Sequence, residues 1–198
     1  MTQEDIIKAV VSAVIGFVVP AALKIFWPKE PDSVESLPWF TWCVAGFVGG
    51  ALGGLGSGFL GLTGTGAGGL GNWAIFGMAI GLFQWFALRG YRSVGVWFIL
   101  ASIIGWALFI LGGAWGWVVS GLAVGILQSL SLGNYRWPFL WIVANPIVWP
   151  IAGWAGIAAG TPLVSLNPVL AWIVGWGVVG FVGAILLLLP MWLMKEKD

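Results

Sequence analysis

Charged side chains and histidine are what this sequence most lacks. Of its 198 residues only 8% are charged, and none is histidine. A soluble domain carries about 25% charged residues. Between Ser36 and Met194 the only formal charges belong to Arg89, Arg92 and Arg136, and no acidic residue occurs there. A chain without acids or histidine in its apolar part has no proton relay and no carboxylate that could couple transport to a cation.

The same shortage removes the usual catalytic and metal-binding sets. Without histidine there is no Ser/His/Asp or Cys/His arrangement, and the apolar region holds no pair of carboxylates. No cluster of metal ligands occurs either. We therefore predict that the protein is not an enzyme and holds no metal. The single cysteine, Cys43, excludes an internal disulfide. A net charge of +1 does not indicate the basic surface that a nucleic-acid-binding protein needs.

What the sequence has in abundance is apolar surface, tryptophan and glycine. Hydrophobic residues make up 60% of the chain, the mean hydropathy is +1.02, and there are 16 Trp and 32 Gly. Tryptophan gathers at membrane interfaces, and glycine is common in membrane-spanning helices. This composition predicts an integral membrane protein with several spans.

An internal repeat organises the middle of the chain. The stretch Gly77–Arg92 returns as Gly121–Arg136, 44 residues later, and the repeat aligns Gln84 with Gln128. A fixed period of this kind indicates duplicated structural units. Because each unit contains two helices, equivalent helices cross in the same direction, which predicts parallel repeats around an axis normal to the membrane.

The spacing of apolar stretches predicts an all-α transmembrane bundle of six or seven spans, since a span needs about 20 apolar residues. Ile6–Trp27 is a retained helix that either spans or lies re-entrant. We divide the chain into an N-terminal helix with a polar loop (1–37) and a bundle (38–198) of three two-helix units, 38–93, 94–137 and 138–198. The expected spans of the bundle are Trp39–Leu60, Leu70–Leu88, Val94–Leu111, Trp117–Leu132, Phe139–Ala159 and Pro168–Met194.

Charges outside the first residues gather in every second loop. They lie at 28–37, 89–93 and 133–137 and in the tail after 194, whereas the loops between them carry none. Loops rich in Arg and Lys remain in the cytoplasm. We predict that the arginine-bearing loops and the C-terminus are cytoplasmic.

Two glutamines are the most informative polar residues in the spans. Gln84 and Gln128 each place a primary amide in hydrocarbon, where it needs hydrogen-bond partners. They act either as clamps between helices or as ligand contacts, for example to a pigment magnesium or a polar lipid group. Trp106 and Trp149, with Trp154 and Trp176, are expected deep in the membrane, where they either line a flat ligand site or pack against glycines.

A second group is expected at headgroup depth. Its members are either an interfacial belt or a rim for anionic lipid or an acidic partner. This group contains Arg89, Tyr91, Arg92, Tyr135 and Arg136. The tryptophans near predicted span ends are expected in the same belt; they are Trp85, Trp97, Trp115, Trp117, Trp137, Trp141, Trp172 and Trp192.

The pattern G-x-x-x-G-L-x-Q-W-x-x-L-R, carried here by Gly77, Gly81, Leu82, Gln84, Trp85, Leu88 and Arg89, resembles an element of bacterial multi-pass membrane proteins. Such proteins are frequent in cyanobacteria and Chloroflexi, where the element also occurs as a membrane part attached to signalling proteins. The second copy has Ser129 and Gly133 in place of the Trp and the Arg. The resemblance implies a membrane module in a bacterial cytoplasmic or a thylakoid membrane and supplies no mechanism.

Three functions remain open on the sequence. The first is a non-catalytic membrane module that serves as an accessory subunit or as the anchor of a sensor. Small residues at four-residue spacing, such as Gly46, Gly50 and Gly54, favour close packing between helices in the membrane. The expected partners are therefore membrane lipids together with other membrane protein subunits or a second copy of the chain. The second is binding of a lipid, carotenoid or chlorophyll-type ligand. The third is a pore, for which few polar residues are present.

Overall fold

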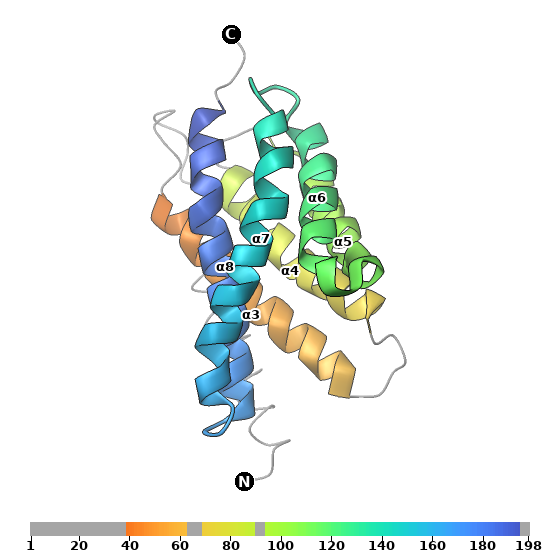
Figure 1. The fold of residues 1–198 in the computed structure, drawn as a ribbon. Helices are drawn as coiled ribbons and strands as arrows, with labels where there is room; N and C mark the ends of the chain where they lie inside the picture. The colour runs from red at the N-terminus through yellow and green to blue at the C-terminus, as the bar shows by residue number, and fades with distance from the viewer. Residues whose placement is uncertain (1–38, 63–68, 90–93, 195–198) are drawn as a thin grey trace.

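A computed structural model describes residues 39–62, 69–89 and 94–194 of the chain (Figure 1). These residues include every expected span of the bundle. The expected helix Ile6–Trp27 and two members of the expected rim, Tyr91 and Arg92, lie outside the described residues.

Within the described ranges the protein is a bundle of α-helices, which confirms the predicted all-α class. Five segments are long and apolar enough to cross a membrane, consistent with an integral membrane protein. The α-helices are α3 (Trp39–Leu62), α4 (Leu70–Arg89), α5 (Trp97–Ala107), α6 (Gly116–Ser129), α7 (Phe139–Gly160) and α8 (Pro168–Leu193), and the 3₁₀ segments are η2 (Leu108–Trp115), η3 (Leu130–Leu132) and η4 (Thr161–Leu163).

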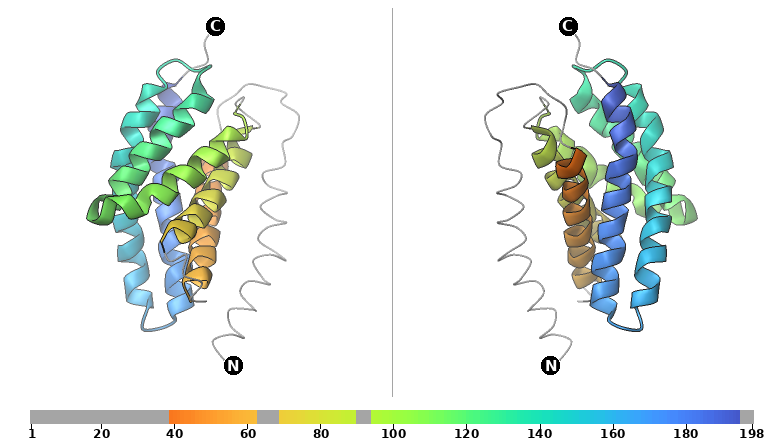
Figure 2. Two further views of the ribbon diagram at one scale, coloured as in Figure 1. Left: turned by 90° about the vertical axis from the view of Figure 1, so that its right-hand side faces the viewer. Right: turned by 90° about the vertical axis from the view of Figure 1, so that its left-hand side faces the viewer.

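The hairpin formed by α5, η2 and α6 is shorter than its neighbours. Its two α-helices have 11 and 14 residues, whereas α7 has 22 and α8 has 26. The chain reverses at Gly113, whose φ of 51° and ψ of −121° suit glycine. Figure 2 shows that this bend stops well short of the end reached by the α7–α8 turn. The expected spans Val94–Leu111 and Trp117–Leu132 therefore form one hairpin beside longer helices.

Helices adjacent in the chain pack side by side, and α8 packs against α3, so the six helices form a closed ring. The closing contact is made by glycines. A Cβ on Gly180 would meet the carbonyl oxygen of Gly46, and a Cβ on Gly50 would meet the carbonyl oxygen of Trp176. Only glycine lets two helix backbones approach this closely, and in lipid such packing replaces the hydrophobic drive between helices.

Glycines separated by 44 residues make corresponding helix contacts. In α4, Gly77 lies against the backbone of Ser102 in α5. In α6, Gly121 lies against the backbone of Asn145 in α7. The α4–α5 and α6–α7 pairs thus cross at matching points of the aligned sequence.

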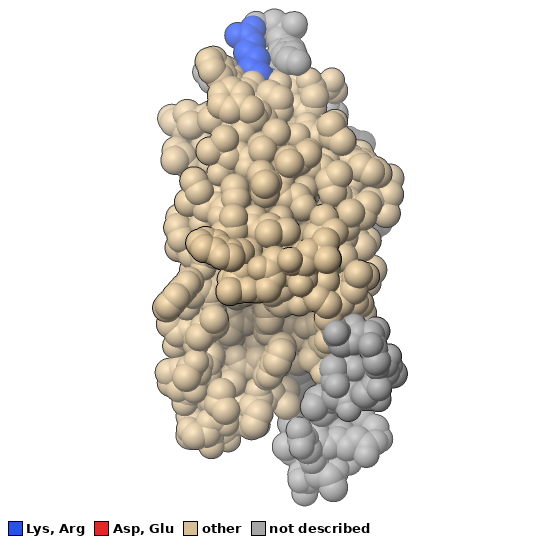
Figure 3. Space-filling model, turned by 45° about the vertical axis from the view of Figure 1, so that its right-hand side comes forward, with Lys and Arg blue, Asp and Glu red and all other residues tan. Residues whose placement is uncertain are grey.

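All charge among the described residues lies at one end of the bundle. Arg89 ends α4, and Arg136 precedes α7 in the loop beside the C-terminal end of α8 (Figures 1 and 2). In the view of Figure 3 the described surface is basic only at that end and is otherwise uncharged.

The α3–α8 glycine contact gives a first prediction. Gly180→Ala should lower the free energy of unfolding in detergent by about 1–3 kcal/mol, because the added methyl group meets backbone that cannot rotate away. Gly95→Ala is the matched control, since a Cβ at Gly95 meets nothing within 4 Å. Equal thermal midpoints for the two variants would show that α3 and α8 are not held together in this way.

The arrangement of the loops gives a second prediction. In a Cys43→Ala background, cysteines at Gly95 and Asn134 should react with an impermeant thiol reagent from the same side of the membrane. A cysteine at Leu166, in the turn between α7 and α8, should react from the opposite side because α7 is long enough to cross. Labelling of positions 95 and 134 from different compartments would contradict the ring topology.

Candidate functional site

Gln128 is a clamp between three helices. Its Nε2 donates to Ser102 Oγ in α5 at 2.7 Å, and its Oε1 accepts from Trp141 Nε1 in α7 at 2.8 Å. Ser102 Oγ in turn donates to the Phe98 carbonyl at 3.1 Å. Gln128 is 1% exposed. Both ends of its amide are therefore bonded to side chains of neighbouring helices.

The polar contacts continue along α7. Asn145 Nδ2 donates to the Trp141 carbonyl at 2.7 Å, and Trp149 Nε1 donates to Asn145 Oδ1 at 2.8 Å. Trp141 is 1% exposed, so its expected place in an interfacial belt is wrong: the bond to Gln128 holds it inside. Trp149 is 1% exposed, whereas Trp154, on the same helix, is 78% exposed.

Gln84 lies at the aligned position of α4 but is not bonded in the same way. It is 1% exposed, and its Nε2 has no acceptor among the described residues. The residue aligned with Trp141 is Trp97, and its Nε1 donates to the Leu127 carbonyl of α6 at 3.0 Å instead. The clamp is therefore present in the second aligned unit and incomplete in the first.

The expected rim is divided between two environments. The Arg89 guanidinium lies over the rings of Trp85 and Phe86, 5.1 and 4.6 Å from their centroids, and Arg136 is exposed. Tyr135 is fully buried, so it does not lie on a lipid-facing rim. Its ring belongs to the hydrophobic core.

Aromatic rings fill the centre of the helix ring. Trp106 is fully buried, with ring centroids 4.7 Å from Phe76 and 4.8 Å from Trp149 in edge-to-face geometry. Trp73 stacks on the same indole at 6.0 Å. Such edge-to-face and offset pairs are the preferred geometries of aromatic rings. The centre of the bundle is thus packed with rings rather than lined with polar groups.

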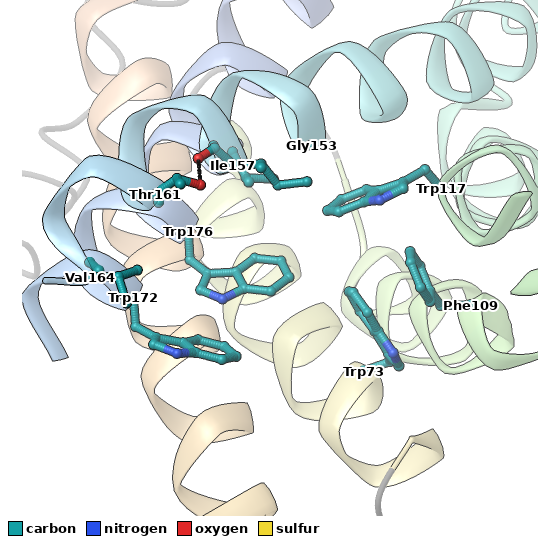
Figure 4. A pocket seen from close by; sticks show the side chains of 14 residues that line it. Trp73, Phe109, Trp117, Gly153, Ile157, Thr161, Val164, Trp172 and Trp176 are labelled. Atoms are coloured by element: carbon teal, nitrogen blue, oxygen red, sulfur yellow. Dashed lines mark hydrogen bonds between the residues drawn. The ribbon is translucent and has the colours of Figure 1, made fainter. Parts of the chain in front are cut away.

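Beside this cluster lies a pocket of about 400 Å³. Its lining includes residues from the parts of α7 and α8 that extend beyond the bend of the α5–α6 hairpin, which Figure 2 shows at the end of the bundle away from the α6–α7 loop. Figure 4 shows the lining side chains. The residues that line it come from α4, η2, α6, α7, η4 and α8; they are Trp73, Phe109, Trp117, Gly153, Gly156, Ile157, Gly160, Thr161, Val164, Ala171, Trp172, Gly175, Trp176 and Val179.

Two sets of aromatic rings form the walls of the pocket (Figure 4). Trp73 and Phe109 stack with centroids 3.6 Å apart, and Trp172 and Trp176 stack at 5.8 Å. Between them, glycines of α7 and α8 expose flat backbone. The hydroxyl of Thr161 is used within the chain, where it donates to the Ile157 carbonyl at 2.7 Å. The lining residues carry no charge.

The sequence predicts only some of the residues that line this pocket. Trp176 was expected at depth, while Trp117 and Trp172 were assigned to the belt, and Trp73 was not singled out. A usable signal was the spacing of Trp172 and Trp176, which places two indoles on one face of a helix. Their convergence with Trp73 and Phe109 depends on the short hairpin, which no local pattern predicts.

Comparison of the chain with protein-family models, with curated proteins and with solved structures yields no match. The resemblance to bacterial multi-pass proteins accordingly stays a prediction.

The two glutamines give a third prediction. Gln128→Met, which keeps the shape of the side chain, should lower the free energy of unfolding by about 1 kcal/mol because it removes two interhelical hydrogen bonds. Gln84→Met should lower the free energy of unfolding by a smaller amount, since the Gln84 Nε2 has no acceptor to lose. Unfolding in graded denaturing detergent compares the two. A larger loss at Gln84 would show that the aligned amides do not differ as described.

Proposed function

We propose that the protein is a non-catalytic integral membrane module that binds an uncharged, lipid-soluble ligand in the aromatic pocket. The observation that supports this most directly is the pocket itself. Its volume of about 400 Å³ falls in the range of small-molecule sites, roughly 300–1,000 Å³. Its walls are indole and phenyl faces and glycine backbone, which suit a flat or elongated apolar molecule.

The charge distribution narrows the class of ligand. The two described arginines lie at the opposite end of the bundle, and no lining residue is charged. An ionised headgroup placed in this pocket would lose its hydration without gaining a counter-charge, which costs several kcal/mol in an apolar medium. The ligand is therefore neutral, or places any charged group outside the pocket.

A role as an accessory subunit or a sensor anchor stays a second candidate. Its motivation was the glycine-rich face of the first bundle helix. Gly46, Gly50 and Gly54 of α3 are in contact with α8 of the same chain, so this face supports folding and is not free for another subunit. A pore is the least supported candidate, because Trp106, Phe76 and Trp149 occupy the centre of the ring.

Ligand retention gives a fourth prediction. Protein transferred from its native membrane into lipid nanodiscs should carry a neutral lipophilic compound above the level in empty nanodiscs. Ile157→Trp, at the pocket wall, should reduce the bound amount by about tenfold, because the added indole fills the space that the ligand needs. Solvent extraction with mass spectrometry and an absorbance spectrum measure the retained compound.

The matched control is Ile151→Trp, on the same helix. Ile151 is 50% exposed and does not line the pocket, so this variant should retain the compound at the wild-type level. Retention that is identical in both variants, or no compound beyond the empty-nanodisc background in the wild type, would contradict binding in this pocket.

A further inference from the structure

The tryptophans of the pocket differ from those of the helix contacts in their hydrogen bonds. Most buried or half-buried indoles outside the pocket donate to an acceptor; the exception is Trp106, which is fully buried and whose Nε1 has no acceptor among the described residues. Trp42 donates to the Ala184 carbonyl at 2.8 Å, Trp85 to the Val94 carbonyl at 2.8 Å, and Trp149 to Asn145 Oδ1 at 2.8 Å. In an apolar environment this pairing matters, because an unpaired donor keeps its full desolvation penalty.

The indoles at the pocket have no such partner. No described residue accepts a hydrogen bond from Nε1 of Trp73, Trp117, Trp172 or Trp176. Trp176 is the central one of the four: its centroid lies 5.8 Å from Trp172, 6.0 Å from Trp117 and 5.6 Å from Trp73. Figure 4 shows its ring between Trp172 on one side and the rings of Trp73, Phe109 and Trp117 on the other. Four of the residues that line the pocket are thus indoles whose N–H groups are unpaired among the described residues, and the lining side chains offer no acceptor besides the Thr161 oxygen.

We infer that the ligand of this pocket is a flat, lipophilic ring compound that carries carbonyl oxygens, of the quinone class. This inference rests on the proposed function and names the chemistry of the same site. A ring carbonyl accepts from an indole N–H, while its flat ring stacks on neighbouring indole faces. A pure hydrocarbon would fill the apolar space and leave the donors unpaired. A donor-rich ligand, such as a sterol-type alcohol or an amine, would find too few acceptors.

The test compares two probes of the same shape. Wild-type protein in nanodiscs is titrated with an alkylated 1,4-naphthoquinone and with the matching alkylnaphthalene, and empty nanodiscs correct for partition into lipid. We expect the naphthoquinone to bind at least about fivefold more tightly, the effect of one added hydrogen bond. Its carbonyl stretching band should move to lower wavenumber on binding relative to its value in an alkane solvent.

Trp176→Phe keeps an aromatic ring at the centre of the pocket and removes its N–H. In this variant the naphthoquinone should lose about fivefold in affinity and part of the carbonyl shift, while alkylnaphthalene binding should stay unchanged. The hydrocarbon probe therefore also reports whether the variant is folded. Trp154→Phe, a change at a residue that is 78% exposed and not part of the pocket, should alter neither probe.

The outcomes separate this inference from the proposed function. Equal affinity for both probes without a carbonyl shift would overturn the carbonyl assignment and leave an apolar binding site. Binding of a diacylglycerol as tightly as the naphthoquinone would overturn the ring requirement, because its ester carbonyls lack a flat ring. If neither probe bound above the empty-nanodisc level and Ile157→Trp changed nothing, both the inference and the pocket function would fail.

Discussion

The backbone contact between α3 and α8 is the constraint on which the rest of the structure depends. Lipid removes the hydrophobic drive between helices, so two apolar helices stay together only through close packing and hydrogen bonds. Gly46 and Gly180 allow the two backbones to approach each other, and the Trp42 indole stabilises the contact by donating a hydrogen bond to the Ala184 carbonyl. Further along the same face, Gly54 leaves room for the ring of Trp176. The contact that closes the helix ring therefore also places the central residue of the pocket.

The bundle divides into a hydrogen-bonded half and an aromatic half. Near the arginines, Gln128 joins α5, α6 and α7, and Asn145 extends the contacts along α7. Beyond Trp149 the polar contacts between helices give way to rings. The reason is geometric, because the α5–α6 hairpin ends while α7 and α8 continue (Figure 2). The extended parts of α7 and α8 lack two neighbours there, and the space they leave is the pocket.

Composition and spacing predicted the all-α class and the ends of most helices to within a few residues, because charges and glycine-rich turns mark them. They did not predict which face of each helix is buried. The helices are apolar on all sides, so hydrophobic periodicity cannot separate the interior from lipid. This is why Trp141 and Tyr135 were expected in an interfacial belt, although they are only 1% and 0% exposed. The pocket needed tertiary contacts that no single helix encodes.

The two glutamines show how an aligned sequence yields unequal sites. Gly77 and Gly121 make matching helix contacts, yet only Gln128 gains an indole donor. The first unit loses its counterpart because Trp97 turns toward α6 and bonds the Leu127 carbonyl. A buried amide with an unpaired N–H costs about 1–3 kcal/mol. The α4–α5 contact therefore lacks a counterpart of the hydrogen bond that joins Gln128 of α6 to Trp141 of α7, although the glycines of both contacts pack alike.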